Sequence, residues 1–244
     1  MNETNDLTIG WFGKLPSLGD FVSRRLPTNF VEPWDTWLQE AITASRTQLG
    51  EQWQEIYLTS PIWRFVLMPG IYGNTEMWTG VLMPSVDKVG RHFPLTIATP
   101  VKPHPGMMQS VVAAQAWYAE LEQVALASLD FDISPDALDD RLAQHPFPGL
   151  LTHYSQMPSR EFSDWWQNKS WQDMDAAHKV FRLTTADSLS RLFEDTISDV
   201  FNTSGSGKSI WWTVEFETGL TQMHCFIGLP PTNYFSTLLI NDAK

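Results

Sequence analysis

The stretch that decides the fold spans residues 63–99 and reads WRFVLMPGIYGNTEMWTGVLMPSVDKVGRHFPLTIAT. It holds three apolar runs of strand length, which cover residues 63–68, 77–83 and 93–99. Glycine and proline residues separate the runs and indicate tight connections between them. Three consecutive strands that follow one helix are typical of a largely antiparallel or mixed sheet, and not of a doubly wound parallel one.

A helix is predicted before these strands. Apolar residues at positions 34, 37, 38, 41, 42 and 49 recur at spacings of three and four, so they would share one helix face. Pro33 suits the first turn of such a helix, and Gly50 suits the position after its last residue. The predicted helix therefore spans residues 33–49.

The rest of the chain mixes helices and strands without regular alternation. We expect further helices over residues 107–129, 135–142 and 189–201, a last helical turn near 234–239, and strands over 7–12, 210–216 and 223–227. The pattern predicts a single α+β domain with a central sheet flanked by helices. Residues 1–140 would form its N-terminal core, and residues 141–244 would complete the same domain with helices and two further strands.

The composition excludes several classes of protein. The 244 residues carry a net charge of −12 and include no basic stripe, so nucleic acids and anionic membrane surfaces are not expected partners. The N-terminus is polar and acidic, and no apolar stretch reaches the length of about 20 residues that a membrane span needs. A single cysteine, Cys225, allows no internal disulfide. We expect a cytoplasmic protein.

Tryptophan is unusually frequent, with 12 in 244 residues, while charged residues make up only 18%. Core positions would account for most of them, because tryptophan is largely buried on average. A partner protein would account for the rest, since large aromatic side chains with few charges around them are typical of interface cores. Trp165 and Trp166, in a stretch without clear periodicity, are therefore candidate contact residues.

One motif resembles a phosphate-binding loop, Gly207-Lys208-Ser209. The first glycine of that motif should stand five residues before Gly207, where the chain has Asn202. A helix should also follow it, whereas residues 210–216 predict a strand. We therefore expect no nucleotide site and an exposed Lys208 in a flexible loop, whose removal changes neither stability nor partner binding.

No other catalytic or metal-binding pattern stands out. Six histidines are scattered without the i, i+4 pair of a helical zinc site. His224 and Cys225 are neighbours in a predicted strand, so their side chains should point to opposite faces, and Cys225 should be a buried structural residue. The sequence thus predicts no catalytic residues, no metal and no cofactor.

Two polar loops, residues 19–27 and 83–94, gather most of the basic residues of the first hundred positions. Together they hold Asp20, Arg24, Arg25, Asp87, Lys88 and Arg91. Two interpretations stand side by side: a structural network of aspartates and arginines that ties the loops to the sheet, or a recognition surface. We expect Asp20 and Arg91 to be structural, and Arg24 and Arg25 to be exposed and in contact with a partner.

Several blocks of the chain resemble one known family. They are residues 10–21 (GWFGKLPSLGDF), 30–38 (FVEPWDTWL), 60–65 (SPIWRF) and 80–91 (GVLMPSVDKVGR), with a weaker block at 209–212 (SIWW). In order and spacing these blocks are similar to the TagF family of type VI secretion-associated proteins. The resemblance implies a post-translational repressor of type VI secretion that binds the forkhead-associated scaffold protein of the apparatus. Some members are fused to a PP2C-type phosphatase; the 244 residues leave no room for one, so we expect no phosphatase activity.

Our main hypothesis is a non-enzymatic regulatory protein that represses secretion by sequestering this scaffold protein. One alternative is an uncharacterised hydrolase or phosphate-binding enzyme that uses the two polar loops, and a second is a structural adaptor of the secretion apparatus. A homodimer is left open. The candidate partner-binding residues are Asp20, Arg24, Arg25, Asp87, Arg91, Trp165 and Trp166.

Overall fold

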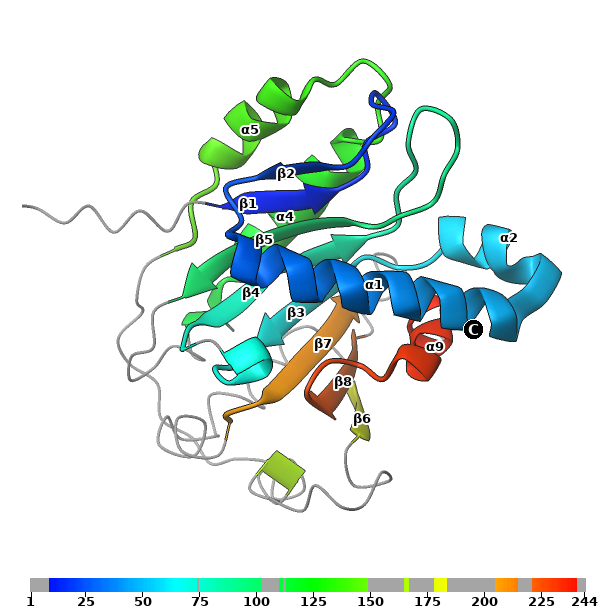
Figure 1. Cartoon of the computed structure of the whole chain (residues 1–244). Coiled ribbons are helices and arrows are strands. Elements are labelled where there is room, and N and C mark those ends of the chain that lie inside the picture. The colour runs from blue at the N-terminus through cyan, green and yellow to red at the C-terminus, as the bar shows by residue number, and fades with distance from the viewer. Residues whose placement is uncertain are drawn as a thin grey trace, which may run out of the picture.

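One antiparallel sheet organises the chain (Figure 1). The structure is a computed structural model that describes residues 9–73, 75–101, 110–111, 113–148, 165–166, 178–183, 205–214 and 221–240. Within these residues, eight strands form one sheet in the order β2-β1-β5-β4-β3-β7-β8-β6, and each pair of neighbours is antiparallel. The strands are β1 (Gly10–Gly13), β2 (Val22–Arg24), β3 (Trp63–Leu67), β4 (Met77–Met83), β5 (Leu95–Val101), β6 (His178–Leu183), β7 (Lys208–Val214) and β8 (Thr221–Ile227).

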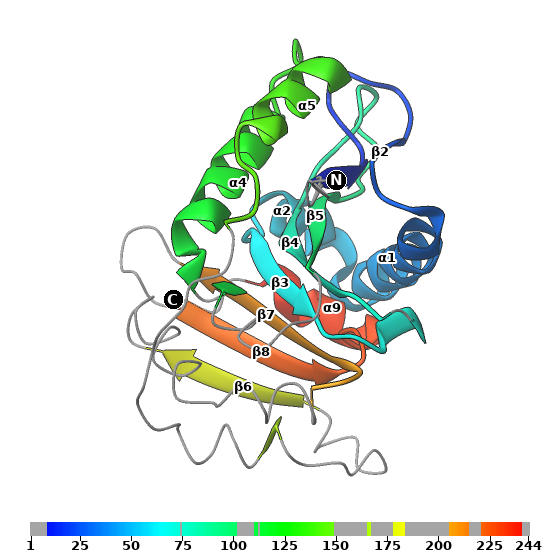
Figure 2. The same cartoon turned by 90° about the vertical axis from the view of Figure 1, so that its left-hand side faces the viewer.

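Helices cover both faces of the sheet (Figures 1 and 2). One face carries α1 (Thr28–Leu49), α2 (Trp53–Leu58) and α9 (Phe235–Leu239), and the other carries α4 (Gln115–Ala127) and α5 (Pro135–Ala143). Short 3-10 turns complete the described elements: η1 (Gly50–Gln52), η2 (Ile71–Gly73) and η3 (Thr232–Tyr234). Two hydrophobic clusters fill the spaces between these layers, one on each face of the sheet.

The fold class predicted from the sequence is confirmed. The three runs of residues 63–99 form β3, β4 and β5, which lie side by side in the sheet. The predicted start of the helix at residue 135 is also correct, since the Ser134 hydroxyl accepts a hydrogen bond from the amide of Ala137 (3.1 Å) and Pro135 occupies the first turn. His224 and Cys225 belong to opposite sides of β8, and Cys225 is fully buried.

The first helix begins earlier than predicted. It starts at Thr28, so Pro33 lies inside the helix and not in its first turn. The extra turn is stabilised by Phe30, which is 1% exposed and packs against Trp34 and Trp78. Burial of one large aromatic side chain outweighs the backbone hydrogen bond that a proline removes near a helix start.

Two strands escaped prediction. The strand β2 has only three residues, two of which are polar and exposed, and it lies at one edge of the sheet. The strand β6 forms the other edge, in the stretch without periodicity. Both lack the alternation of apolar and polar residues that marks a strand in sequence. The predicted helix over residues 189–201 lies outside the described residues.

Most tryptophans belong to the interior, as expected. Trp165 is only partly buried, and Trp171 lies outside the described residues. Several indole N–H groups find internal acceptors: that of Trp34 donates to the Thr96 hydroxyl (2.8 Å), and that of Trp37 donates to the Pro230 carbonyl (2.8 Å). The buried members are Trp11, Trp34, Trp37, Trp53, Trp63, Trp78, Trp117, Trp166, Trp211 and Trp212.

Two histidines, the buried His224 and the half-buried His178, lie where β6 and β8 pack beside η3. The Nε2 atom of His178 lies 3.4 Å from Nδ1 of His224, and the Tyr234 hydroxyl lies 3.4 Å from the same Nδ1 atom. Burial lowers the pKa of His178 to about 4. Burial, reinforced by the neighbouring His178, lowers the pKa of His224 to about 3. Both rings are therefore neutral in the folded protein at neutral pH.

Replacement of Trp37 tests the packing of α1 on the sheet. Trp37→Ala should destabilise the fold by about 3–5 kcal/mol, because it removes a buried indole and its hydrogen bond. Urea unfolding measures the change. Leu58→Ala, at a side chain that is 51% exposed, is the control and should cost well under half as much. A midpoint close to that of the wild type for Trp37→Ala would place this helix face outside the core.

The histidine pair predicts a pH dependence of stability. Both groups titrate near pH 6.5 in the unfolded chain and lower in the folded one, so mild acid favours unfolding. Their contribution should be complete above about pH 6.5 and should shrink as the pH falls toward about 4. Urea unfolding between about pH 7.5 and about pH 4.5 measures the slope, which His224→Phe should flatten. Equal slopes for wild type and His224→Phe would contradict this assignment.

Candidate functional site

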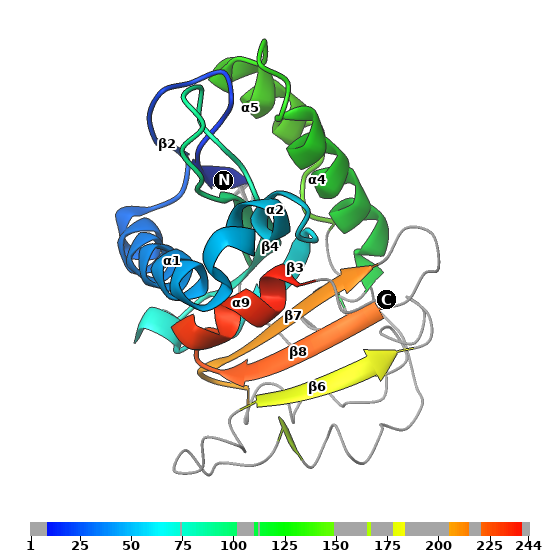
Figure 3. The same ribbon diagram turned by 90° about the vertical axis from the view of Figure 1, so that its right-hand side faces the viewer.

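Several connections of the chain meet at one end of the sheet. The strand registers pair the end of β1 with the start of β5, and the end of β4 with the starts of β3 and β5. The β1–β2 loop (residues 14–21), the β4–β5 loop (84–94) and the α2–β3 link (59–62) therefore lie together. We call this side the loop end, and Figure 3 views the molecule from it.

Helices from both faces reach the loop end. Arg64 of β3 forms a two-pronged ion pair with Glu122 of α4, with Nε–Oε1 at 2.5 Å and Nη2–Oε2 at 2.8 Å. The helix continues from Glu122 to the α4–α5 turn, which lies beside the β1–β2 loop (Figures 2 and 3). On the opposite face, the Trp63 indole donates to the Leu238 carbonyl of α9 (2.7 Å). Both helix ends are thus fixed next to the loops.

Asp87 lies at the centre of the β4–β5 loop and is 1% exposed. Its Oδ2 atom accepts hydrogen bonds from Lys14 Nζ (2.9 Å) and Arg91 Nε (2.6 Å), and its Oδ1 atom accepts from the amides of Val89 (3.0 Å) and Arg91 (2.9 Å). Burial by itself would raise the pKa of Asp87. The hydrogen bonds from the Arg91 amide, Lys14, the Arg91 side chain and the Val89 amide outweigh burial and hold the pKa far below its usual range.

This carboxylate also joins the two polar loops. Lys14, which is 5% exposed, comes from the β1–β2 loop, and Arg91 donates a further hydrogen bond to the Gly19 carbonyl. The Lys88 amide donates to the Leu18 carbonyl (2.8 Å). Of the two interpretations, the structural network holds for Asp87 and Arg91. As a buried group, Asp87 presents no surface to a partner, which corrects its assignment as a contact residue.

The two neighbouring arginines differ in their surroundings. Arg24 is half exposed and lies 3.5 Å from Asp136. Arg25 has a left-handed backbone (φ 59°), its Nε donates to the Ile9 carbonyl (2.7 Å), and its Nη1 lies 2.9 Å from Oδ2 of Asp139. Arg25 therefore ties β2 to α5, although its residue is exposed as expected, with a side chain that is 32% exposed. Arg24 stays a candidate contact.

Asp20 is exposed, contrary to the expected structural role. Its Oδ1 atom accepts a hydrogen bond from the next amide, that of Phe21 (2.8 Å). Gly19 beside it lets the chain turn, but the Asp20 carboxylate is exposed and takes no part in the network around Asp87. Asp20, Lys88 and the guanidinium of Arg91, whose side chain is 59% exposed, are thus among the polar groups that these loops show to solvent.

Of the two candidate tryptophans, Trp165 is partly buried and Trp166 lies in the interior. Trp166 is fully buried, so it is not a contact residue in this fold. Lys208 is 3% exposed, donates to the Trp166 carbonyl and lies 5.1 Å from the centre of the Trp166 ring. The expected exposed lysine in a flexible loop is therefore wrong. Lys208 is the first residue of β7, and a strand follows it as predicted.

Exposed apolar side chains gather at the loop end. Among the described residues, every large hydrophobic side chain that is exposed belongs to a loop, turn or helix end on this side. Sequence reasoning missed them because single apolar residues in polar loops carry no periodic signal. They are Phe21, Leu58, Val89, Leu126, Leu129, Phe131 and Ile240.

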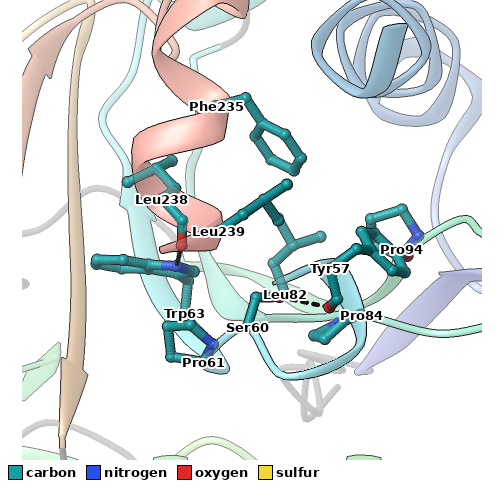
Figure 4. Close-up of a pocket in the computed structure, with 10 residues that line it drawn as sticks. All are labelled: Tyr57, Ser60, Pro61, Trp63, Leu82, Pro84, Pro94, Phe235, Leu238 and Leu239. Carbon is teal, nitrogen blue, oxygen red and sulfur yellow. Dashed lines mark hydrogen bonds between the residues drawn. The ribbon is translucent and has the colours of Figure 1, made fainter. Parts of the chain in front are cut away.

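A shallow apolar hollow lies at the loop end, between α2, the start of β3 and α9 (Figure 4). The space between its walls is about 260 Å³, a figure that includes open solvent. The polar groups on its wall are occupied, since the Tyr57 hydroxyl donates to the Ser85 carbonyl (3.0 Å) and burial raises the pKa of Tyr57. The lining of the hollow consists of Tyr57, Ser60, Pro61, Trp63, Leu82, Pro84, Pro94, Phe235, Leu238 and Leu239.

The described residues contain no group of three or more histidine, cysteine, aspartate or glutamate side chains placed to hold a metal ion. Among the described helices, none is long and apolar enough to span a membrane. Burial raises the pKa of Cys225, so this thiol is a poor nucleophile.

Comparison with known proteins gives the family. A family model described as the TagF N-terminal domain, type VI secretion system-associated, matches residues 10–145. The chain belongs to the TagF family. In structure it is similar to PA0076 from Pseudomonas aeruginosa PAO1, with a TM-score of 0.67 and 31% sequence identity over 97% of this chain and 96% of that one. A search of curated proteins found no match.

The family match covers most of the loop end. Residues 10–145 run from β1 through α5 and include the β1–β2 loop, the β4–β5 loop and the α4–α5 turn. The strands β7 and β8 and the helix α9 lie outside the matched range, yet they belong to the same sheet and the same hydrophobic clusters. This TagF-family chain is thus a type VI secretion-associated protein with one continuous α+β fold.

The network around Asp87 predicts a large effect of a small substitution. Asp87→Asn should destabilise the fold by about 3–5 kcal/mol, because it leaves the buried Lys14 ammonium without its counter-charge. Asp20→Asn, an isosteric change at an exposed carboxylate of the same loops, should cost less than about 0.5 kcal/mol. Thermal and urea unfolding compare the two. Similar stabilities of both variants would show that the Asp87 network does not hold the loops.

Proposed function

We propose that this TagF-family chain is a non-enzymatic regulator that represses type VI secretion after translation. It acts by binding and sequestering the forkhead-associated scaffold protein of the apparatus in the cytoplasm. The observation that carries the proposal is the confinement of exposed apolar side chains to the loop end, within the described residues. Exposed apolar side chains that gather on one side of a molecule mark a site of contact with another protein.

The same contacts argue against the hydrolase or phosphate-binding alternative. Such an enzyme would use the loops that hold Asp20, Arg24 and Arg25, and Asp87 and Arg91, with Asp87 as a base or Arg25 to hold a phosphate. Every hydrogen bond described for Asp87 comes from the β1–β2 or the β4–β5 loop. Arg25 contacts the Ile9 carbonyl and Asp139. Both side chains would have to leave internal partners to reach a substrate, which favours a structural role for them.

Purified proteins test the proposal directly. The wild-type chain should bind the forkhead-associated protein in a titration. The double variant Leu58→Ser/Val89→Ser should bind at least about tenfold more weakly, since two exposed apolar contacts are lost from the loop end. Thr43→Ala/Thr47→Ala on the exposed side of α1 is the matched control and should bind like the wild type. Unfolding midpoints confirm that all variants are folded.

Gene deletion separates regulation from assembly. Loss of a repressor should raise secretion, whereas loss of a structural adaptor should abolish it. A wild-type chain that fails to bind the forkhead-associated protein, or a deletion that stops secretion, would contradict the proposed function. Binding that is equal for the wild type and the Leu58→Ser/Val89→Ser variant would move the contact away from these two residues of the loop end.

A further inference from the structure

The α4–α5 turn carries the most exposed aromatic side chain that the structure describes. Phe131 is 67% exposed, and Leu126 (47%) and Leu129 (37%) lie just before it. We call residues 126–136 the acidic knuckle. It belongs to the loop end and lies beside the β1–β2 loop (Figures 2 and 3).

The acidic knuckle holds a fixed shape. Asp130 Oδ1 accepts a hydrogen bond from the Asp132 amide (3.0 Å), and the Ser128 hydroxyl donates to the Ala125 carbonyl (2.6 Å). Ile133, which is 6% exposed, anchors the turn in the core below, and Ser134 caps α5. Phe131 is therefore displayed by a rigid turn, so a partner would lose little entropy in ordering it.

Charge distinguishes this turn from the rest of the loop end. Residues 113–140 contain seven aspartates and glutamates and no lysine or arginine. Three of the seven form ion pairs with arginines of the sheet strands and the residue after β2. The carboxylates of Asp130 and Asp132, on either side of Phe131, face solvent. For an acidic surface that contacts only water, an exposed phenyl ring between the carboxylates brings no gain in stability.

We propose that the acidic knuckle is the element that the forkhead-associated protein recognises. Phe131 enters an apolar hollow of the partner, and Asp130 and Asp132 contact the arginine cluster with which forkhead-associated modules bind phosphorylated and acidic motifs. Charge complementarity selects this occupant, because an acidic rim around an aromatic tip requires a partner with a basic rim around an apolar hollow. The inference rests on the proposed function and deepens it.

The aromatic contact is tested by calorimetric titration of the full-length chain into the forkhead-associated protein. Phe131→Ser should weaken binding at least about tenfold, as expected for a central anchor residue. Phe131→Trp keeps a large aromatic surface and should stay within about threefold of the wild type. Phe131 is exposed, so both variants should unfold at the wild-type midpoint. Wild-type affinity of Phe131→Ser would overturn the proposal.

The charge contact needs a variant that keeps the turn intact. Asp130→Asn/Asp132→Asn removes two charges, and the side-chain amide oxygen introduced at position 130 can still accept the hydrogen bond from the backbone amide at position 132. Glu40→Gln/Glu51→Gln changes the net charge by the same amount at exposed positions of α1 and η1. At about 50 mM salt the knuckle variant should bind several-fold more weakly, and its affinity should fall less between about 50 and about 300 mM salt. Identical salt dependence in both variants would overturn the electrostatic part.

The outcomes separate this inference from the proposed function. If the wild type binds and Phe131→Ser binds equally well, the inference fails while the proposed function stands. If the wild type does not bind at all, both fail. A second copy of the chain is the competing occupant: a wild-type dimer in light scattering that Phe131→Ser converts to monomer would assign the acidic knuckle to self-association and overturn the proposal.

Discussion

A single buried carboxylate holds the loop end together. Asp87 binds Lys14 from one loop and Arg91 from its own, together with two backbone amides, so two loops far apart in sequence share one charge centre. A buried carboxylate without a counter-charge would cost folding free energy. We therefore expect Asp87 and its two cations to form their contacts together and to lose them together. The exposed side chains of both loops depend on this centre for their positions.

On the face of the sheet that carries α4 and α5, ion pairs hold these two helices against the loop end. Arg64 pairs with Glu122, and Asp139 accepts hydrogen bonds from both Arg25 and the Trp11 indole (2.6 Å to the latter). These contacts fix the acidic knuckle beside the β1–β2 loop. Most of the charged residues that the sequence assigned to a recognition surface therefore hold the loops and helices of that surface in place. The surface itself consists of apolar side chains and the carboxylates around Phe131. This division of roles fits a protein of the TagF family that works by contact.

The sequence by itself determined the class of fold and most of its elements. The runs of residues 63–99 predicted β3, β4 and β5, because strand length and turn residues are local properties. The four blocks that resemble the TagF family could also be recognised from local sequence alone. Local pattern could not find β2 or β6, which lack alternation, nor the earlier start of α1, which burial of Phe30 decides.

Only the tertiary structure decided which charges support and which are displayed. Asp20 and Asp87 are the same residue type in two similar loops, yet one is exposed and the other buried, because Lys14 and Arg91 converge on Asp87 alone. Lys208 and Trp166 were likewise expected at the surface. Both lie in the interior, where the Lys208 ammonium donates a hydrogen bond to the Trp166 carbonyl. Burial and ion pairing depend on residues that are distant in the chain, and no local pattern records them.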